Sequence, residues 1–480
     1  MPIGGDLRTK RSRRFATRTQ TPRTVVDSII LTTHFPSNRT LILVFLLTLG
    51  TTYYYFHLLL PRARLQESKI EMAGPYAFGG DFYPIWLTGR ELISHRTNPY
   101  TQEMTRTIQT GLFGRPMDPR RPVDPPTEFR AFSYPLYADL LAAPVLPFKF
   151  DSVRLVLGFL LPVTAAYSVV LWLHAFKFHL SRRALSVAII LVLISYPVLE
   201  GLYALQVGVW VGIALAISTA AMARGRLFLA GMFLAFASVK PQLVWLLALW
   251  LMLWAVSDWK RRKVLALSFV LTLSILFLAS QLLLPGWFVG WWRSLVGYSH
   301  YTLPPLAQLV LGRFPGAALE LILLMVAIAI CWRSRQQPVG SLDFSLALSF
   351  VLAASVMFMP TGGAVYDQVI LLPAILWLCF QRAEIVKAAL PIRIVGLSVL
   401  IALCWQWFGA CTVVLISLFR PAWTSSPAVL VFPTRMAAPL PFTILALLSY
   451  FAVGSLRGKT SAGDSLIIRL SDQGSRAKST

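Results

Sequence analysis

Long apolar runs alternate with short polar stretches from Leu41 to Val453. A run of about 20 apolar residues is long enough to cross a bilayer as a helix. The pattern therefore predicts an all-α fold, a polytopic transmembrane helical bundle of about twelve spans. Their approximate limits are 40–60, 155–175, 184–199, 203–222, 227–239, 241–257, 264–284, 316–332, 343–359, 366–380, 390–418 and 437–454.

The segment 135–148 is apolar but short, and three prolines interrupt it. Counting it as a span would move the basic loop Lys260 to Lys263 to the outer side of the membrane, opposite to the basic amino-terminal tail. Short basic loops normally lie on the cytoplasmic side. We therefore interpret 135–148 as an interfacial or re-entrant segment.

The distribution of charge predicts the orientation. Lys and Arg gather in the two tails and in short loops, and almost all of these loops fall on one side when the amino terminus is cytoplasmic. We expect basic cytoplasmic tails at 1–39 and 457–480 and one transmembrane domain at 40–456, in a plasma (inner) membrane. The net charge of +24 follows this topology, so it does not indicate nucleic-acid binding.

Two large loops are then expected on the extracytoplasmic side, at 61–154 and 285–315. In the first loop, apolar positions at Ile85, Leu92 and Ile93 predict an amphipathic helix from Asp81 to Ser94. We expect this helix to lie on the bilayer surface.

Asp81 is the candidate catalytic residue, in the sequence Gly-Gly-Asp-Phe-Tyr-Pro-Ile-Trp. A carboxylate at the membrane surface can act as a general base on a hydroxyl group presented there. Neighbouring aromatic side chains such as Trp86 can stack on a sugar or anchor at the headgroups. The alternative is that Asp81 only caps the helix that follows it.

Two cationic residues are candidate substrate-binding residues. Arg90 could contact a phosphate, or it could belong to a solvated helix face with local ion pairing. Lys240 lies within an apolar stretch at an expected outer tip. Ionisable residues at membrane depth are functional candidates, although a lysine can also extend its amine to the membrane surface.

Four further residues on the expected outer side are candidate substrate-binding residues: Tyr134, Gln206, His300 and Asp367. Each has a structural alternative. Tyr134 could belong to an interfacial aromatic belt, and Gln206 could serve helix packing. His300 could be an ordinary interfacial histidine, and Asp367 could cap a span.

Motifs for soluble activated substrates do not occur in this sequence, which has no phosphate-cradling G-x-x-x-x-G-K-[ST] and no dinucleotide-binding G-x-G-x-x-G. A transferase of this kind would take an activated substrate that is dissolved in the membrane. No cofactor is indicated, and no metal site, because no second histidine is spaced to join His300. The four cysteines lie in apolar runs and are interpreted as packing residues.

At these positions the chain resembles glycosyltransferase family 87, a group of C-type (GT-C) integral membrane glycosyltransferases that includes polyprenol-phosphate-mannose-dependent mannosyltransferases. The resemblance covers roughly residues 75–385. It rests on Asp81-Phe82 leading to Gly89-Arg90, Asn98-Pro99-Tyr100, Tyr134-Pro135 with Pro144, Gln206, the stretch from Gly231 to Lys240-Pro241, and the turn from Pro360 to Asp367.

The resemblance implies a GT-C-like fold with a large first outer loop, a polyprenyl-phosphate sugar donor and inverting transfer. It places the catalytic carboxylate at Asp81, a donor-phosphate contact at Lys240 and an active-site histidine at His300. We expect transfer of a hexose such as mannose to a glycolipid or polysaccharide acceptor on the extracytoplasmic face. The alternatives are a multi-span transporter or lipid flippase, and a structural partner without catalysis.

Overall fold

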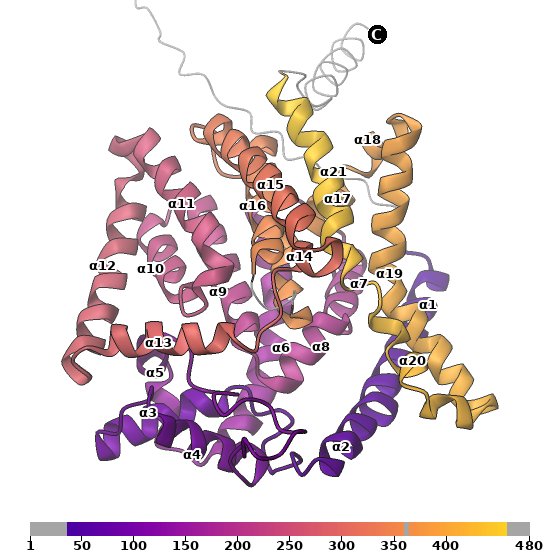
Figure 1. The fold of residues 1–480 in the computed structure, drawn as a ribbon. Helices are drawn as coiled ribbons and strands as arrows, with labels where there is room; N and C mark the ends of the chain where they lie inside the picture. Colours follow the sequence, from indigo (N-terminus) through magenta and orange to yellow (C-terminus); the bar gives the residue numbers. More distant parts are fainter. Residues whose placement is uncertain (1–35, 360–363, 458–480) are drawn as a thin grey trace, which may run out of the picture.

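The computed structural model describes residues 36–359 and 364–457 (Figure 1). Within these two ranges the chain forms helices and no strand, which confirms the predicted all-α fold. Most of the two basic tails lies outside the described residues. Residues 360–363, where the sequence predicts a turn before Asp367, also lie outside them.

Among the described residues, six helical segments are long and apolar enough to cross a membrane. They are the continuous helix of α1 (Asn38–Tyr53), η1 (Tyr54–Leu59) and α2 (Leu60–Lys69), then α6 (Phe150–Ala175), α12 (Trp259–Leu283), α15 (Arg313–Ser334), α19 (Leu390–Phe419), and the segment that ends with α21 (Pro439–Leu456). A seventh span results if α7 (Arg182–Leu193) and α8 (Tyr196–Ala204), which meet at 61°, form one bent span. The structure is thus a helical membrane bundle.

The other apolar helices are shorter. They are α9 (Val207–Ala223), α10 (Leu227–Ala237), α11 (Pro241–Ser257), α16 (Leu342–Phe358), and η3 (Val365–Leu371) with α17 (Leu372–Phe380). Each of the twelve predicted spans overlaps one of the long or short apolar helices. Twelve crossings remain a prediction, because the short helices fall below the ~20 residues of a full span.

Some of the short helices lie in the interior of the bundle. Every residue of α16 from Phe344 to Met357 is buried, and α16 packs against α11, α15, α17 and α21. By contrast, α12 exposes large apolar side chains such as Leu278 and Leu282. Lipid can solvate the exposed apolar face of α12, whereas protein surrounds α16 on all sides. A helix shorter than a full span can lie in the interior of the bundle, because protein and not lipid surrounds it.

The loop helices gather at one end of the bundle, where α13 lies above α3, α4 and α5 (Figure 1). They are α3 (Tyr83–His95), α4 (Gln102–Phe113), α5 (Tyr137–Leu141), η2 (Ala143–Val145) and α13 (Trp287–Ser299). Helix α14 (Leu306–Leu311), also from the second loop, lies higher in Figure 1, beside α15 and α16. The indole of Trp291 donates to the Ser133 carbonyl at 3.0 Å, and the Ser294 hydroxyl donates to the Phe132 carbonyl at 2.7 Å. The two large loops therefore lie on the same end, as the topology predicts.

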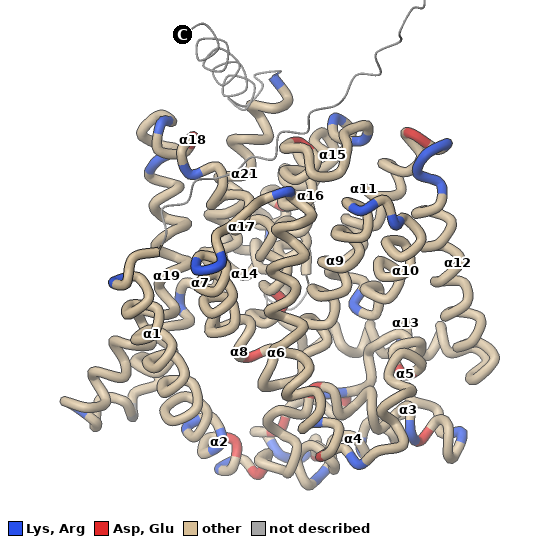
Figure 2. The backbone as a smooth tube through the Cα atoms, turned by 180° about the vertical axis from the view of Figure 1, so that it is seen from behind, with Lys and Arg blue, Asp and Glu red and all other residues tan. Residues whose placement is uncertain are grey.

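The opposite end carries basic turns. Figure 2 shows Lys and Arg where α11 meets α12, near the end of α15 and at α18 (Arg382–Lys387), whereas acids and bases mix around α2, α3 and α4. The remaining short helices are η4 (Pro421–Ser425), α20 (Pro427–Leu430) and η5 (Phe432–Thr434). Which end faces the cytoplasm stays a prediction from loop charge.

Two predictions about the first loop can be compared with the structure. The segment 135–148 contains only α5 and η2, so it is too short to cross a membrane, in line with the interfacial interpretation. The helix expected from Asp81 to Ser94 begins at Tyr83 and ends at His95, and most of it is buried under protein. The apolar face of α3 thus packs against protein, with Tyr83 and Trp86 on Phe150, and its position at the bilayer surface stays a prediction.

The polar insert that follows α4, residues 114–131, is held by ion pairs. The Arg115 guanidinium donates to both oxygens of Asp124, at 2.5 and 2.7 Å, and Arg121 pairs with Glu71 at 2.7 Å. The Asp124 side chain is fully buried. The hydrogen bonds from Arg115 lower the pKa of Asp124 to about 2.

This pKa predicts that the insert loses stability in acid. A carboxyl group whose pKa is lowered by folding stabilises the fold above its ordinary pKa of about 4, and this contribution is lost as the pH falls toward 2. We expect pepsin to cleave the segment 114–131 faster at pH 2 than at pH 4. Asp124→Asn should be cleaved rapidly at both pH values. Equal cleavage of the wild type at both pH values would contradict the prediction.

Candidate functional site

Asp81 lies two residues before α3 and does not cap it. The residue at the N-cap position is Phe82, and no side chain makes a capping hydrogen bond there. The Asp81 N–H donates to the Ala204 carbonyl at 3.0 Å, which ties the loop to the end of α8. The capping interpretation of Asp81 is therefore wrong, and the carboxylate is directed elsewhere.

Two side chains from distant parts of the chain hold the Asp81 carboxylate. Arg130 donates to Oδ1 at 3.0 Å, and the Gln206 amide donates to Oδ2. Gln206 is buried at the start of α9, and 16% of the Asp81 side chain remains exposed. Each carboxylate oxygen thus has one protein donor, which leaves further lone pairs for a substrate hydroxyl.

Arg130 is the main functional candidate that the sequence analysis missed. The Asp81 carboxylate raises the pKa of Arg130, so the guanidinium is charged. Its Nε is buried without a partner among the described residues, yet 38% of the side chain is exposed. Arg130 has donors left for an anion. The one sequence signal was its position between a polar insert and the aromatic segment that contains Phe132 and Tyr134.

Lys240 and Asp367 form a buried ion pair. The Lys240 amine lies 2.6 Å from both carboxylate oxygens, and 8% of the Lys240 and 0% of the Asp367 side chain are exposed. The amine also lies 5.1 Å from the Tyr366 ring centroid. The Lys240 amine therefore binds Asp367 and does not extend to the membrane surface. Asp367 does not cap η3, whose N-cap residue is Ala364.

The start of α9 connects the two pairs. Gln206 contacts Asp81, and two residues later a Cβ on Gly208 would collide with the Asp367 carboxylate and lie 3.7 Å from the Lys240 amine. The Asp81–Arg130 pair and the Lys240–Asp367 pair therefore lie on either side of one helix start. We call these four residues with Gln206 the polar cluster.

Tyrosines adjoin the polar cluster. Burial raises the pKa of Tyr134, and the Asp81 carboxylate raises it further. Burial and the Asp367 carboxylate raise the pKa of Tyr298 on α13 in the same way. Both phenols stay neutral at physiological pH and can donate or accept hydrogen bonds. The influence of Asp81 indicates that the Tyr134 phenol lies near the polar cluster, and its role in a site stays a prediction.

Arg90 and His300 are not joined to the polar cluster by contacts among the described residues. Arg90 is exposed, and its guanidinium lies 5.3 Å from the Trp86 ring centroid. His300 is exposed at the end of α13, two residues after Tyr298. The structure thus brings together Asp81, Gln206, Lys240 and Asp367 with Arg130, and it leaves Arg90 and His300 at the periphery.

An apolar pocket of about 460 Å³ adjoins the polar cluster. Its walls come from α3, α5, η2, α6, α9 and α10. Phe82, Val207 and Val239 line it, and these are the sequence neighbours of Asp81, Gln206 and Lys240. None of the five residues of the polar cluster lines the pocket, so the pocket is next to the cluster through these adjacent positions.

Gly208→Ala tests how closely the start of α9 packs against the Lys240–Asp367 pair. Gly208→Ala should push Asp367 away from Lys240 and lower the free energy of unfolding by about 1–3 kcal/mol, the usual cost of overpacking. The matched control is Gly158→Ala in α6, because a Cβ there meets no described heavy atom within 4 Å. Alanine favours a helix by up to about 1 kcal/mol over glycine, so the control should unfold at the same or a higher temperature. Thermal unfolding in detergent measures both variants, and equal midpoints would contradict the prediction.

Among the described residues, no three His, Cys, Asp or Glu side chains cluster in a way that could hold a metal ion. The four cysteines are free. Comparisons with family models, with curated proteins and with solved structures find no match. The function is therefore argued from the site itself.

Proposed function

We propose that this protein is a membrane glycosyltransferase that moves a hexose, such as mannose, from a polyprenyl-phosphate donor to an acceptor hydroxyl with inversion. The observation that carries the proposal is the Asp81 carboxylate, held by Arg130 and Gln206 beside an apolar pocket of about 460 Å³. This arrangement provides a base and a charged donor next to a place for an apolar chain. The resemblance to glycosyltransferase family 87 suggests the same donor and the same base.

In the proposed reaction, Asp81 accepts the proton of the acceptor hydroxyl while that oxygen bonds to the anomeric carbon. The bond from the anomeric carbon to the phosphate oxygen breaks, and its electron pair leaves with the polyprenyl phosphate. This leaving group is an anion already, so no strong general acid is required. A single displacement inverts the configuration at the anomeric carbon.

The geometry favours Arg130 over Lys240 as the cation that binds the donor phosphate. Asp367 neutralises Lys240, and both side chains are buried. Arg130 retains free donors and exposed surface beside Asp81. Guanidinium groups match phosphate oxygens well. We therefore assign the phosphate contact to Arg130, with Lys240 and Asp367 positioning the start of α9.

The sidedness is part of the proposal. Basic turns mark the end of the bundle opposite to the loop helices, which supports a cytoplasmic position for that end and for both termini (Figure 2). The polar cluster draws Asp81 and Arg130 from the first large loop. The site would then act on the extracytoplasmic face of a plasma membrane, with a glycolipid or polysaccharide acceptor.

The direct test uses purified protein in nanodiscs with radiolabelled polyprenyl-phosphate mannose and a membrane-lipid extract as acceptor. We expect label to move into the extract from the lipid-linked donor and not from a nucleotide-linked mannose. Failure with polyprenyl-phosphate mannose and with polyprenyl-phosphate glucose would contradict the hexose proposal. Movement of intact donor across a proteoliposome membrane without transfer would favour the flippase.

A further inference from the structure

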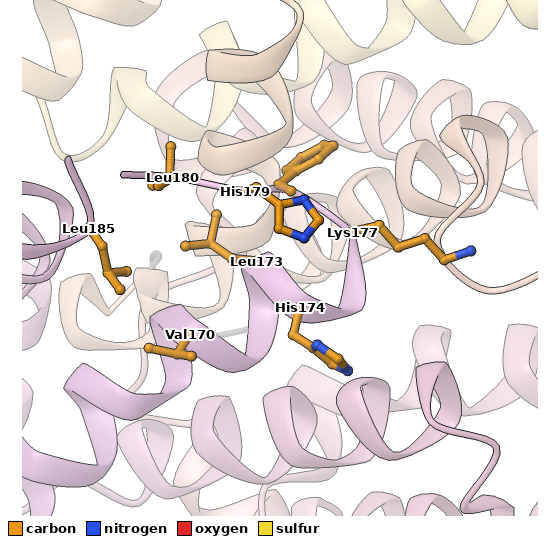
Figure 3. A pocket seen from close by; sticks show the side chains of 8 residues that line it. Val170, Leu173, His174, Lys177, His179, Leu180 and Leu185 are labelled. Atoms are coloured by element: carbon orange, nitrogen blue, oxygen red, sulfur yellow. The ribbon is translucent and has the colours of Figure 1, made fainter. Parts of the chain in front are cut away.

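A second pocket, of about 410 Å³, lies at the carboxyl end of α6 and the segment that follows it. Its lining is divided by chemistry. Figure 3 shows the apolar side chains of Val170, Leu180 and Leu185 on one side, and His174 and Lys177 on the other. None of the described residues that line the pocket is acidic.

The backbone places Lys177 in a position that normally favours glycine. Its φ is 58°, in the left-handed region, and the turn is closed by hydrogen bonds from Lys177 N–H to His174 O and from Phe178 N–H to Leu173 O. Helices commonly end in this way with glycine, which lacks the steric cost of a side chain. Lys177 is exposed, and its side chain starts at the edge of the pocket and extends away from the apolar wall (Figure 3).

A neighbouring helix adds a second permanent cation. Arg224, at the end of α9, donates through Nε to His174 Nε2 at 3.1 Å. Because Nε2 accepts this bond, the ring proton lies on Nδ1, which stays available as a donor. The pocket therefore has one apolar wall and an edge that carries His174 and Lys177, and Arg224 joins this edge through His174.

The pocket lies far from the polar cluster. Helix α6 has 26 residues, which corresponds to about 39 Å at 1.5 Å per residue. Its first residue, Phe150, packs against Tyr83 and Trp86 near Asp81, whereas the pocket surrounds its last turn. A hydrocarbon core is about 30 Å thick, so the two ends of α6 reach opposite headgroup layers.

We propose that this pocket binds the headgroup of an anionic phospholipid, with an acyl chain on the apolar wall and the phosphate at Lys177, Arg224 and His174. The charge, the apolar wall and the position at the end of a membrane-spanning helix all match such a lipid. The site is independent of the transfer reaction proposed above.

Native mass spectrometry of the protein released from nanodiscs tests this site. In phosphatidylcholine nanodiscs that contain phosphatidylglycerol, we expect one phosphatidylglycerol to be retained per chain. Lys177→Gly removes the amine and suits the left-handed turn, so it should fold and bind about five-fold more weakly. Adding Arg224→Gln should bring the loss to roughly twenty-five-fold. The control Arg261→Gln removes a charge that is 86% exposed on α12 and should bind as the wild type does.

Three results would overturn the proposal. Unchanged retention by Lys177→Gly would exclude the pocket, and an equal loss in Arg261→Gln would show diffuse attraction to the surface. Displacement of the lipid by millimolar glycerol 3-phosphate would assign the site to a soluble anion.

Discussion

Asp81→Asn is expected to reduce sugar transfer by about 10²- to 10⁴-fold, the usual contribution of a general base. The amide cannot accept the proton of the acceptor hydroxyl, although it keeps the size of the side chain. The loss should appear in kcat, because the acceptor still binds while its hydroxyl is no longer activated. The measurement is transfer from radiolabelled polyprenyl-phosphate mannose in nanodiscs.

The matched control is Glu103→Gln, which removes an exposed carboxylate from α4 in the same loop region. It should transfer sugar at the wild-type rate. Both variants must still bind donor and unfold near the wild-type temperature, so that a folding defect is excluded. Wild-type activity in a folded Asp81→Asn variant would remove Asp81 from the mechanism.

The apolar pattern predicted the helices well, because helices that face lipid and helices in the protein interior both require a continuous apolar surface. The pattern could not show which of these helices cross the whole membrane. Helices α9 and α16 are more apolar over their full length than α12, yet α16 is enclosed by protein while α12 exposes Leu282. Hydrophobicity alone does not distinguish burial in lipid from burial in protein.

Four of the five residues of the polar cluster were predicted from the sequence, but their pairings were not. Asp81, Gln206, Lys240 and Asp367 stood out because polar residues are rare in such a sequence. Lys240 and Asp367 are 127 positions apart, and no local rule links them. Arg130 was missed because it ends an insert with several other arginines. Arg90 was favoured over it by closeness in sequence to Asp81, whereas in the structure Arg90 lies on Trp86.

The pairing of Lys240 with Asp367 predicts a large effect on stability. Lys240→Met alone leaves a fully buried carboxylate without its cation. Breaking a buried ion pair from one side typically costs about 3–5 kcal/mol, whereas replacing both partners by apolar residues is often neutral. We therefore expect Lys240→Met to lower the thermal unfolding midpoint in detergent strongly, and the double variant Lys240→Met/Asp367→Leu to recover most of the loss.

The double variant also separates a structural role of the pair from a role in binding. If the pair only fixes the start of α9, the stable double variant should transfer sugar with a nearly normal KM for the donor. If Lys240 shifts from Asp367 to the donor phosphate during binding, the double variant should be stable but show a raised KM. A double variant as unstable as Lys240→Met would contradict the ion-pair argument, because the unpaired charge would then not be the cause. The proposal that Arg130 holds the phosphate predicts the first result, since Arg130 retains free donors and Lys240 does not leave its partner.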